Sequence, residues 1–149
     1  MIIADTSGLL AAFGYDARPH QQARAAYEDD TGPVIMSPFV LAELDYMILH
    51  RAGVEKELEL LREVAEGVYE LAEFTRREVA KAADVVGQYS GLGIGLADAS
   101  IVVLAARYGT TRVLTLDERH FRVMRPLNGK AFTILPADGS DRPRAGRSQ

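Results

Sequence analysis

Four acidic residues lie where an α/β sheet would bring carboxylates together. They are Asp5, Glu43, Asp98 and Asp117. Asp5 closes the apolar run MIIA, Asp117 follows RVLTL, and Asp98 opens an apolar segment after a glycine-rich break. In an open parallel sheet, ligands bind beyond the carboxyl ends of the strands, where Asp5 and Asp117 stand. We therefore expect these carboxylates to form a shared site.

A cluster of this kind predicts a bound cation. Converging carboxylates repel one another and titrate abnormally unless a positive ion lies between them. The chain has no cysteine, and its histidines (His20, His50 and His120) are scattered without zinc-site spacing. Oxygen donors favour Mg²⁺ or Mn²⁺ over zinc or copper. Such ions bind phosphate oxygens and activate water, so the predicted chemistry is phosphodiester hydrolysis without a protein nucleophile.

Each acid also has a structural interpretation. An aspartate that begins a helix often serves only as its N-cap, and for any single one of these aspartates that role is as well supported as metal binding. Glu43 differs, because it lies inside a predicted helix at the edge of the apolar stripe, where a partly buried carboxylate is costly unless paired or metal-bound. Asp45, about 140° around that helix from Val40, is predicted to face water.

Two further groups of residues flank the acids. Hydroxyl groups that could orient a carboxylate or a water molecule are those of Thr6, Ser7 and Thr115, although capping and turn roles explain them equally well. Cationic side chains that could contact substrate phosphates are those of Arg119, Arg122 and Arg125, although for each one singly a position in solvent is slightly favoured.

The elements that must position these residues follow from hydrophobic periodicity. Predicted strands span residues 1–4, 34–36, 68–71, 112–116 and 131–135. Predicted helices span residues 8–13, 38–52, 54–66, 75–89 and 96–108; T-x-x-E opens the fourth and Gly109 ends the fifth. Strands that alternate with helices in the approximate order βααβααβααββ predict an α/β fold with a mostly parallel, helix-covered sheet.

Composition is consistent with one folded domain. The 149 residues are 48% hydrophobic and 26% charged, with no repeat or dividing linker. The net charge of −4 argues against a nucleic-acid binder unless acidic residues hold cations, which restore positive charge at a phosphate site. The start MIIAD lacks signal-peptide features, and no apolar run is long enough to span a membrane, so we expect a cytoplasmic protein without membrane contact.

The last residues differ in composition from the rest. Residues 1–136 are predicted to form the domain, and residues 137–149, ADGSDRPRAGRSQ, a disordered polar tail. A solvated tail is favoured over one that touches an RNA backbone.

Four segments together resemble a known family. They are IIADTSGLL, SPFVLAELDYMIL, GLADASIVVLA and VLTLDERHF. In this order and at these separations they resemble PIN-domain proteins, specifically the toxins of VapBC-type toxin–antitoxin pairs, over nearly the whole chain apart from the tail. The resemblance implies a PIN-like α/β fold whose mostly parallel sheet of four or five short strands is covered by helices on both faces. It places the metal-binding acids on Asp5, Glu43 and Asp98, and a more variable fourth acid on Asp117. Many relatives carry an acid where this chain has His120, a departure that could alter substrate contacts.

The resemblance also implies a function. Such toxins are Mg²⁺- or Mn²⁺-dependent endoribonucleases of type II toxin–antitoxin pairs that cut structured RNA, commonly tRNA or rRNA, and so inhibit translation. They form homodimers, and a small VapB-like antitoxin blocks the active site. By analogy, residues 38–66 would carry much of the surface for the antitoxin.

Three functions other than a ribonuclease are alternatives for such a chain. A phosphoacceptor receiver needs paired acids after its first strand and a lysine after a late strand, whereas this chain has a single Asp5 there and only three lysines. A haloacid-dehalogenase-like enzyme would need an aspartate at the position of Ser7. A catalytically silent PIN-fold module that binds RNA or a protein partner is the alternative of a different class, and the intact set of acids argues against it.

Overall fold

The chain folds around a five-stranded, wholly parallel sheet. The computed structural model describes residues 1–15 and 20–139. The strands lie in the order β3-β2-β1-β4-β5. Their bounds are β1 (Ile2–Ala4), β2 (Val34–Met36), β3 (Glu70–Leu71), β4 (Arg112–Leu114) and β5 (Thr133–Leu135). The chain leaves β1 for β2 on one side and later returns to β4 on the other, so the strand order reverses between β1 and β4.

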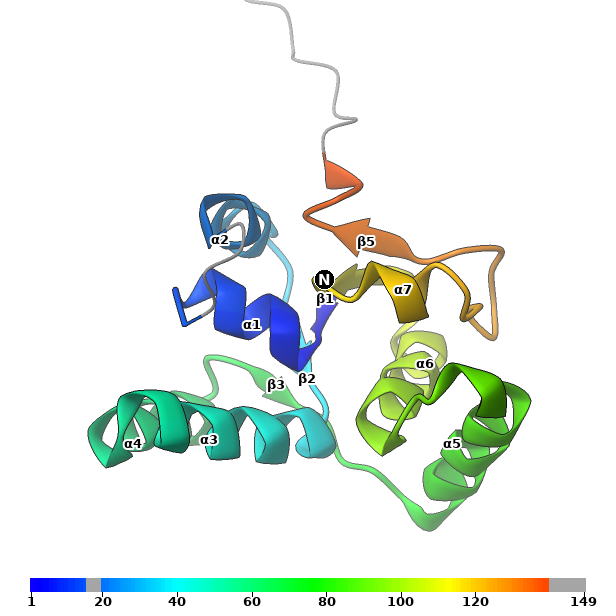
Figure 1. Cartoon of the computed structure of the whole chain (residues 1–149), viewed down its shortest axis with the longest axis horizontal. Coiled ribbons are helices and arrows are strands. Elements are labelled where there is room, and N and C mark those ends of the chain that lie inside the picture. Colours follow the sequence, from blue (N-terminus) through cyan, green and yellow to red (C-terminus); the bar gives the residue numbers. More distant parts are fainter. Residues whose placement is uncertain (16–19, 140–149) are drawn as a thin grey trace, which may run out of the picture.

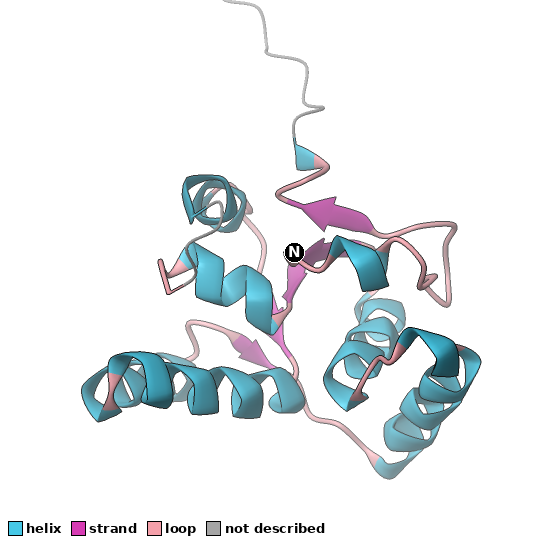
Figure 2. Cartoon of the chain, viewed as in Figure 1, coloured by secondary structure: helices cyan, strands magenta, loops and turns pink. Residues whose placement is uncertain are grey.

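Helices cover both faces of this sheet. They are α1 (Thr6–Ala12), α2 (His20–Glu28), α3 (Pro38–Ala52), α4 (Val54–Ala65), α5 (Arg76–Gln88), α6 (Leu96–Tyr108) and the short α7 (Glu118–Phe121), with a 3-10 turn η1 at Ser90–Leu92. Figure 1 shows α1 to α4 on one side of the central strands and α5 and α6 on the other. Figure 2 shows the strands enclosed between the two helical layers. The predicted fold class is confirmed.

The local signals in the sequence explain most helix boundaries. In α3, Ser37 caps the first turn by accepting a hydrogen bond from the Phe39 N–H, Pro38 occupies the first position, and Gly53 follows the end with a φ of 88°. In α5, Thr75 and Glu78 form the reciprocal capping box that the T-x-x-E pattern predicted. The four residues of α7 were not predicted, because one turn has no measurable apolar period.

The core lies on both faces of the central strands. All residues of β1 and β2 are buried, as is most of α6 from Ala99 to Ala105. Gly8 lets α1 lie directly on the end of β4, because a Cβ at this position would stand 2.2 Å from the carbonyl oxygen of Leu114. This close approach brings the start of α1, and with it Asp5, beside the end of β4.

Asp138, two residues past the expected boundary at residue 136, contacts the domain. Asp138 accepts a hydrogen bond from the Ile134 N–H at 2.8 Å and pairs with Arg122. Residues 140–149 of the predicted tail lie outside the described residues. No helix among the described residues is both long and apolar enough to cross a membrane.

Candidate active site

The four predicted acids line one open cleft at the carboxyl edge of the sheet. The cleft has a volume of about 300 Å³ and is lined by Asp5, Thr6, Ser7, Leu10, Glu43, Met47, Arg51, Asp98 and Asp117. Asp5 follows β1 and Asp117 follows the end of β4, so the site lies at the position where the strand order reverses. The prediction that these carboxylates share a site is therefore consistent with their placement.

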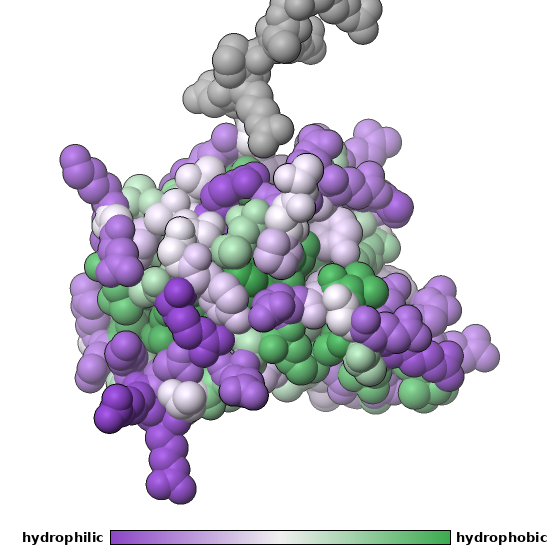
Figure 3. All heavy atoms as spheres, turned by 180° about the vertical axis from the view of Figure 1, so that it is seen from behind, coloured by the Kyte–Doolittle hydropathy of each residue, from purple (hydrophilic) through white to green (hydrophobic). Residues whose placement is uncertain are grey.

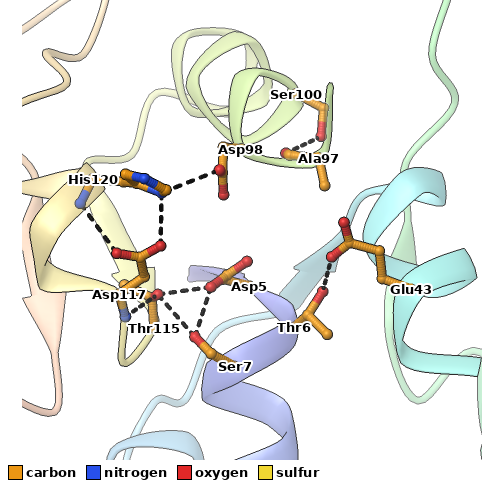
Figure 4. Close-up of polar contacts among 10 residues, drawn as sticks. All are labelled: Asp5, Thr6, Ser7, Glu43, Ala97, Asp98, Ser100, Thr115, Asp117 and His120. Atoms are coloured by element: carbon orange, nitrogen blue, oxygen red, sulfur yellow. Dashed lines mark hydrogen bonds and ion pairs between the residues drawn. The ribbon is translucent and has the colours of Figure 1, made fainter. Parts of the chain in front are cut away.

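Asp5 is held by two hydroxyl groups, one from the first turn of α1 and one from the residue that follows β4. Its Oδ2 accepts hydrogen bonds of 2.7 Å from Ser7 Oγ and 2.7 Å from Thr115 Oγ1. Each hydroxyl oxygen in turn accepts a backbone N–H, Ser7 from Leu116 at 3.0 Å and Thr115 from Asp117 at 2.9 Å. The backbone donors leave the hydroxyl hydrogens directed at Asp5, whose other oxygen points toward the space between Asp98 and Glu43 (Figure 4).

Burial makes Asp5 reluctant to ionise without a counter-charge. The residue is 6% exposed. Desolvation by burial raises the pKa of its carboxyl group above the usual value; the hydrogen bonds from Thr115 and Ser7 lower it, while the charge of Glu43 adds to the increase. Asp5 occupies the N-cap position of α1, yet its side chain makes no capping hydrogen bond, so capping does not explain it.

Asp98 projects from the first turn of α6 toward Asp5 and Asp117. Burial raises the pKa of the Asp98 carboxyl group to about 6, with further increases from the charges of Asp5 and Asp117 and a decrease from His120. The N-cap residue of α6 is Gly95, so Asp98 lies inside the first turn, where a hydrogen bond from the Gly95 backbone lowers its pKa slightly against the effect of burial. Two neighbouring carboxylates that both resist ionisation favour a positive ion between them.

Asp117 performs two tasks at once. Its Oδ1 accepts the backbone N–H of His120 at 3.1 Å, which makes it the N-cap of α7. Its Oδ2 lies 2.7 Å from His120 Nδ1, and Nδ1 lies 3.4 Å from Asp98 Oδ2. The capping interpretation is thus correct for Asp117 and compatible with a ligand role. His120, dismissed from its sequence spacing, joins the carboxylates because the single turn of α7 was not foreseen (Figure 4).

Glu43 completes the acidic set from α3 but is less buried than expected. Thr6 Oγ1 donates a 2.8 Å hydrogen bond to Glu43 Oε2. The residue is exposed, so the prediction of a partly buried carboxylate is wrong. The reason is that the edge of the apolar stripe of α3 borders the open cleft instead of the core. Asp45 is half-buried and not fully in water, and its charge raises the pKa of the neighbouring Glu57 carboxyl group, together with desolvation.

A buried hydroxyl pair fixes α3 against α6. Ser37 Oγ and Ser100 Oγ are 2.7 Å apart, and Ser100 Oγ donates to the carbonyl oxygen of Ala97 at 2.6 Å. Ser37 also caps α3, so this contact ties the first turn of α3 to the first turn of α6. It thereby fixes Glu43 and Asp98 relative to each other across the cleft.

The cationic residues are placed differently from the prediction. Arg51 lines the cleft two turns along α3 from Glu43, and its guanidinium donates to the carbonyl oxygen of Tyr15 at 3.1 Å. The predicted substrate contacts Arg119, Arg122 and Arg125 are exposed and do not line the cleft. Arg122 pairs with Glu118 and Asp138, and Arg125 donates to the Lys130 carbonyl oxygen.

The donor set fits a divalent cation. Asp98, Asp117 and His120 each offer one ligand atom, all within 4.8 Å of one another. His120 Nδ1 is buried and has no hydrogen-bond partner of good geometry in the described part of the chain. A buried polar atom without a partner, beside the Asp98 carboxyl group whose pKa is raised, is the pattern expected of ligand atoms that converge on an ion.

Two sequence comparisons find similar proteins. The family model of the PIN domain matches residues 2–126. Ribonuclease VapC26 of Mycobacterium tuberculosis (strain ATCC 25618 / H37Rv) is 44% identical over 135 residues, which cover 91% of this chain and 100% of that protein.

Two solved structures share the fold. VapC20 of Mycobacterium tuberculosis, described as a sarcin–ricin loop cleaving toxin, superposes with a TM-score of 0.71 at 20% identity, covering 78% of this chain and 90% of that chain. FitAcB from Neisseria gonorrhoeae superposes with a TM-score of 0.57 at 19% identity, covering 76% of this chain and 85% of that chain. At these identities the superpositions show the fold.

Proposed function

The chain belongs to the PIN domain family, and on that premise we propose that it is a metal-dependent endoribonuclease, the toxin of a type II toxin–antitoxin pair. Its substrate would be structured RNA, tRNA or rRNA, whose cleavage inhibits translation. The observation that carries this proposal is the convergence of Asp5, Glu43, Asp98 and Asp117 on one cleft. The similarity to a protein named Ribonuclease VapC26 over 91% of the chain supports it.

The residues of the cleft divide the work of phosphodiester hydrolysis. A bound Mg²⁺ or Mn²⁺ would supply Lewis-acid stabilisation of the phosphate and lower the pKa of attacking water. Asp5, Asp98 and Asp117 would hold that ion, and Ser7 and Thr115 orient Asp5 for it. Because burial raises the pKa values of Asp5 and Asp98, a bound cation would favour their ionised forms and so lower these pKa values.

Glu43 has a different environment from the other three acids. It is exposed to the cleft, and Thr6 fixes its Oε2 at 2.8 Å. An accessible carboxylate across the cleft from the more enclosed acids is suited to accept a proton from the attacking water or to complete the ligand set.

Arg51 is the cationic side chain of this cleft. Every other charged residue that lines it is acidic. A guanidinium donates in a planar fork that matches phosphate oxygens. We assign Arg51 the contact with a phosphate next to the scissile one. The sequence analysis had considered Arg119, Arg122 and Arg125 for contacts with substrate phosphates. The ion pairs of Arg122 leave it less suited to that role.

A partner surface is available on α3 and α4. Exposed large apolar side chains lie along these helices: Tyr46, Leu49, Val54, Leu58 and Leu61. Figure 3, which views the molecule from behind Figure 1, shows hydrophobic residues in green among hydrophilic residues in purple. Exposed apolar clusters rimmed by polar residues are typical of protein interfaces. We propose that this surface receives a VapB-like antitoxin and that the toxin itself forms a homodimer.

The proposal is tested by incubating the purified, partner-free protein with total cellular RNA in Mg²⁺ or Mn²⁺ and mapping new RNA ends by sequencing. Discrete cuts that vanish in EDTA and return on metal addition support a ribonuclease. An intact RNA pool, with the protein shown to be folded and metal-loaded, would instead favour the alternative, a catalytically silent module that binds RNA or a protein partner.

A further inference from the structure

The short helix α7 presents an imidazole to two carboxylates of the site. His120 Nδ1 lies 2.7 Å from Asp117 Oδ2 and 3.4 Å from Asp98 Oδ2. The contact with Asp117 is built into the backbone, because Asp117 caps α7 and His120 is the third residue of the helix. The Asp117 cap occupies Oδ1, so Oδ2 stays directed at the imidazole and the cleft.

The imidazole nitrogen and the two carboxylate oxygens lie close together but do not form well-aligned hydrogen bonds. Nδ1 is buried, yet among the described residues it makes no hydrogen bond of good geometry. An ion with bond lengths near 2.1 Å and angles near 90° holds neighbouring ligand atoms roughly 3.0 Å apart. The two separations of 2.7 and 3.4 Å lie on either side of this value. These separations fit ligands of a common ion.

We propose that His120 binds the catalytic cation directly through Nδ1, and that this nitrogen ligand makes the site prefer Mn²⁺ to Mg²⁺. The inference rests on the proposed function, because it concerns the same cation. Mg²⁺ takes oxygen ligands almost exclusively, whereas imidazole suits the transition metals and binds more strongly along the series that begins at Mn²⁺. Asp98 and Asp117 supply the oxygen ligands beside it.

The test measures the metal and does not depend on RNA cleavage. RNA-free protein is loaded with Mn²⁺, and the ¹⁴N hyperfine coupling of a bound imidazole is recorded by pulsed electron paramagnetic resonance. We expect the coupling in the wild type, its loss in His120→Asp, and its retention in His50→Gln. His50 is the control histidine, because its exposed side chain contacts the Tyr46 carbonyl oxygen through Nδ1 and does not line the cleft.

Calorimetric titration of Mn²⁺ and Mg²⁺ gives a second readout. Replacing His120 by aspartate gives the site oxygen ligands only. The ratio of Mn²⁺ to Mg²⁺ affinity should therefore fall by roughly tenfold or more, which is the size of effect found when groups around a bound metal are altered. A wild type without nitrogen coupling, or an unchanged affinity ratio in His120→Asp, would overturn the inference. Such results, with metal-dependent RNA cleavage intact, would leave the ribonuclease function standing.

Discussion

Thr115 donates a 2.7 Å hydrogen bond to Asp5, although 110 residues separate them in the chain. The bond joins the loop after β4 to the end of β1, the two neighbouring strands between which the strand order reverses. Because these strands are neighbours in the sheet, the bond fixes the position of the Asp5 carboxylate. A hydroxyl at this position also accepts the Asp117 N–H, so one side chain positions two of the four acids.

Replacing Thr115 by valine should weaken both metal binding and the fold. The variant removes a donor to Asp5, so the pKa of that carboxyl group rises further, and it leaves the Asp117 N–H without its acceptor. We expect about 1–3 kcal/mol of lost stability in urea unfolding and about tenfold weaker Mn²⁺ binding by calorimetry. Thr133→Val in β5 makes the same replacement outside the site and should leave Mn²⁺ binding unchanged. Equal effects of the two variants on binding would refute the positioning role.

Alanine at Gly8 should disrupt the contact between α1 and β4. Its Cβ would lie 2.2 Å from the carbonyl oxygen of Leu114, a backbone atom that cannot rotate away. We expect a loss of about 3 kcal/mol in the free energy of unfolding. Gly87→Ala in α5 has nothing within 4 Å of the added Cβ and should stabilise the protein by roughly 0.5–1 kcal/mol. Chemical denaturation of both variants checks this contrast, and a tolerated Gly8→Ala would contradict the close packing.

The stability of the metal-free protein should fall as pH rises toward 6. The pKa of Asp98 is raised from 3.8 to about 6 in the folded state, so between these values the folded protein binds more protons than the unfolded chain. Stability is then greatest below about pH 4 with respect to this group and is lost as pH rises through 6. Because Asp98 is only partly enclosed, we expect a change on the order of 1–2 kcal/mol.

The measurement is urea unfolding in EDTA from pH 4 to pH 7.5, taken as the difference between the wild type and Asp98→Asn. Saturation with Mn²⁺ at pH 7.5 should offset the loss, by about 2.7 kcal/mol at a hundredfold excess over Kd. If the free energy of unfolding of the wild type minus that of Asp98→Asn rises with pH in EDTA, burial does not raise the pKa of the Asp98 carboxyl group.

Arg51 should contribute to substrate binding more than to the chemical step. Arg51→Gln is expected to raise KM with little change in kcat, and to reduce the slope of log affinity against log salt by about one for an RNA that the protein binds. Arg62→Gln changes an exposed arginine in the last turn of α4 and serves as the control. A fall in kcat with unchanged KM and salt slope would argue against a phosphate contact.

The sequence was sufficient for the parts of the site that depend on local rules. Asp5 and Asp117 were placed at one edge of the sheet because parallel strands direct their ends there, and both line the cleft. The bounds of α3 were predicted correctly because Pro38 and Gly53 mark its ends. The predicted strand at 68–71 was longer than the observed β3, because only Glu70 and Leu71 pair with β2.

The parts that were missed depend on tertiary placement. His120 reaches the carboxylates through one turn of helix that carries no periodic signal. Arg51 borders the cleft because of how α3 lies against the sheet, which a helical wheel does not describe. The exposure of Glu43 has the same origin, since periodicity assigns a face of a helix but not whether that face meets core or cleft.

The most direct measurement compares RNA cleavage by the wild type, Asp98→Asn and Asp45→Asn under identical Mn²⁺ concentrations, with folding of each checked by circular dichroism. Asp45 is an acid of α3 that does not line the cleft, so its variant controls for the loss of a charge. The account predicts specific cuts by the wild type and by Asp45→Asn, and none by a folded Asp98→Asn. Cleavage by Asp98→Asn at the wild-type rate, or cleavage that persists in EDTA, would contradict a carboxylate-held cation as the basis of activity.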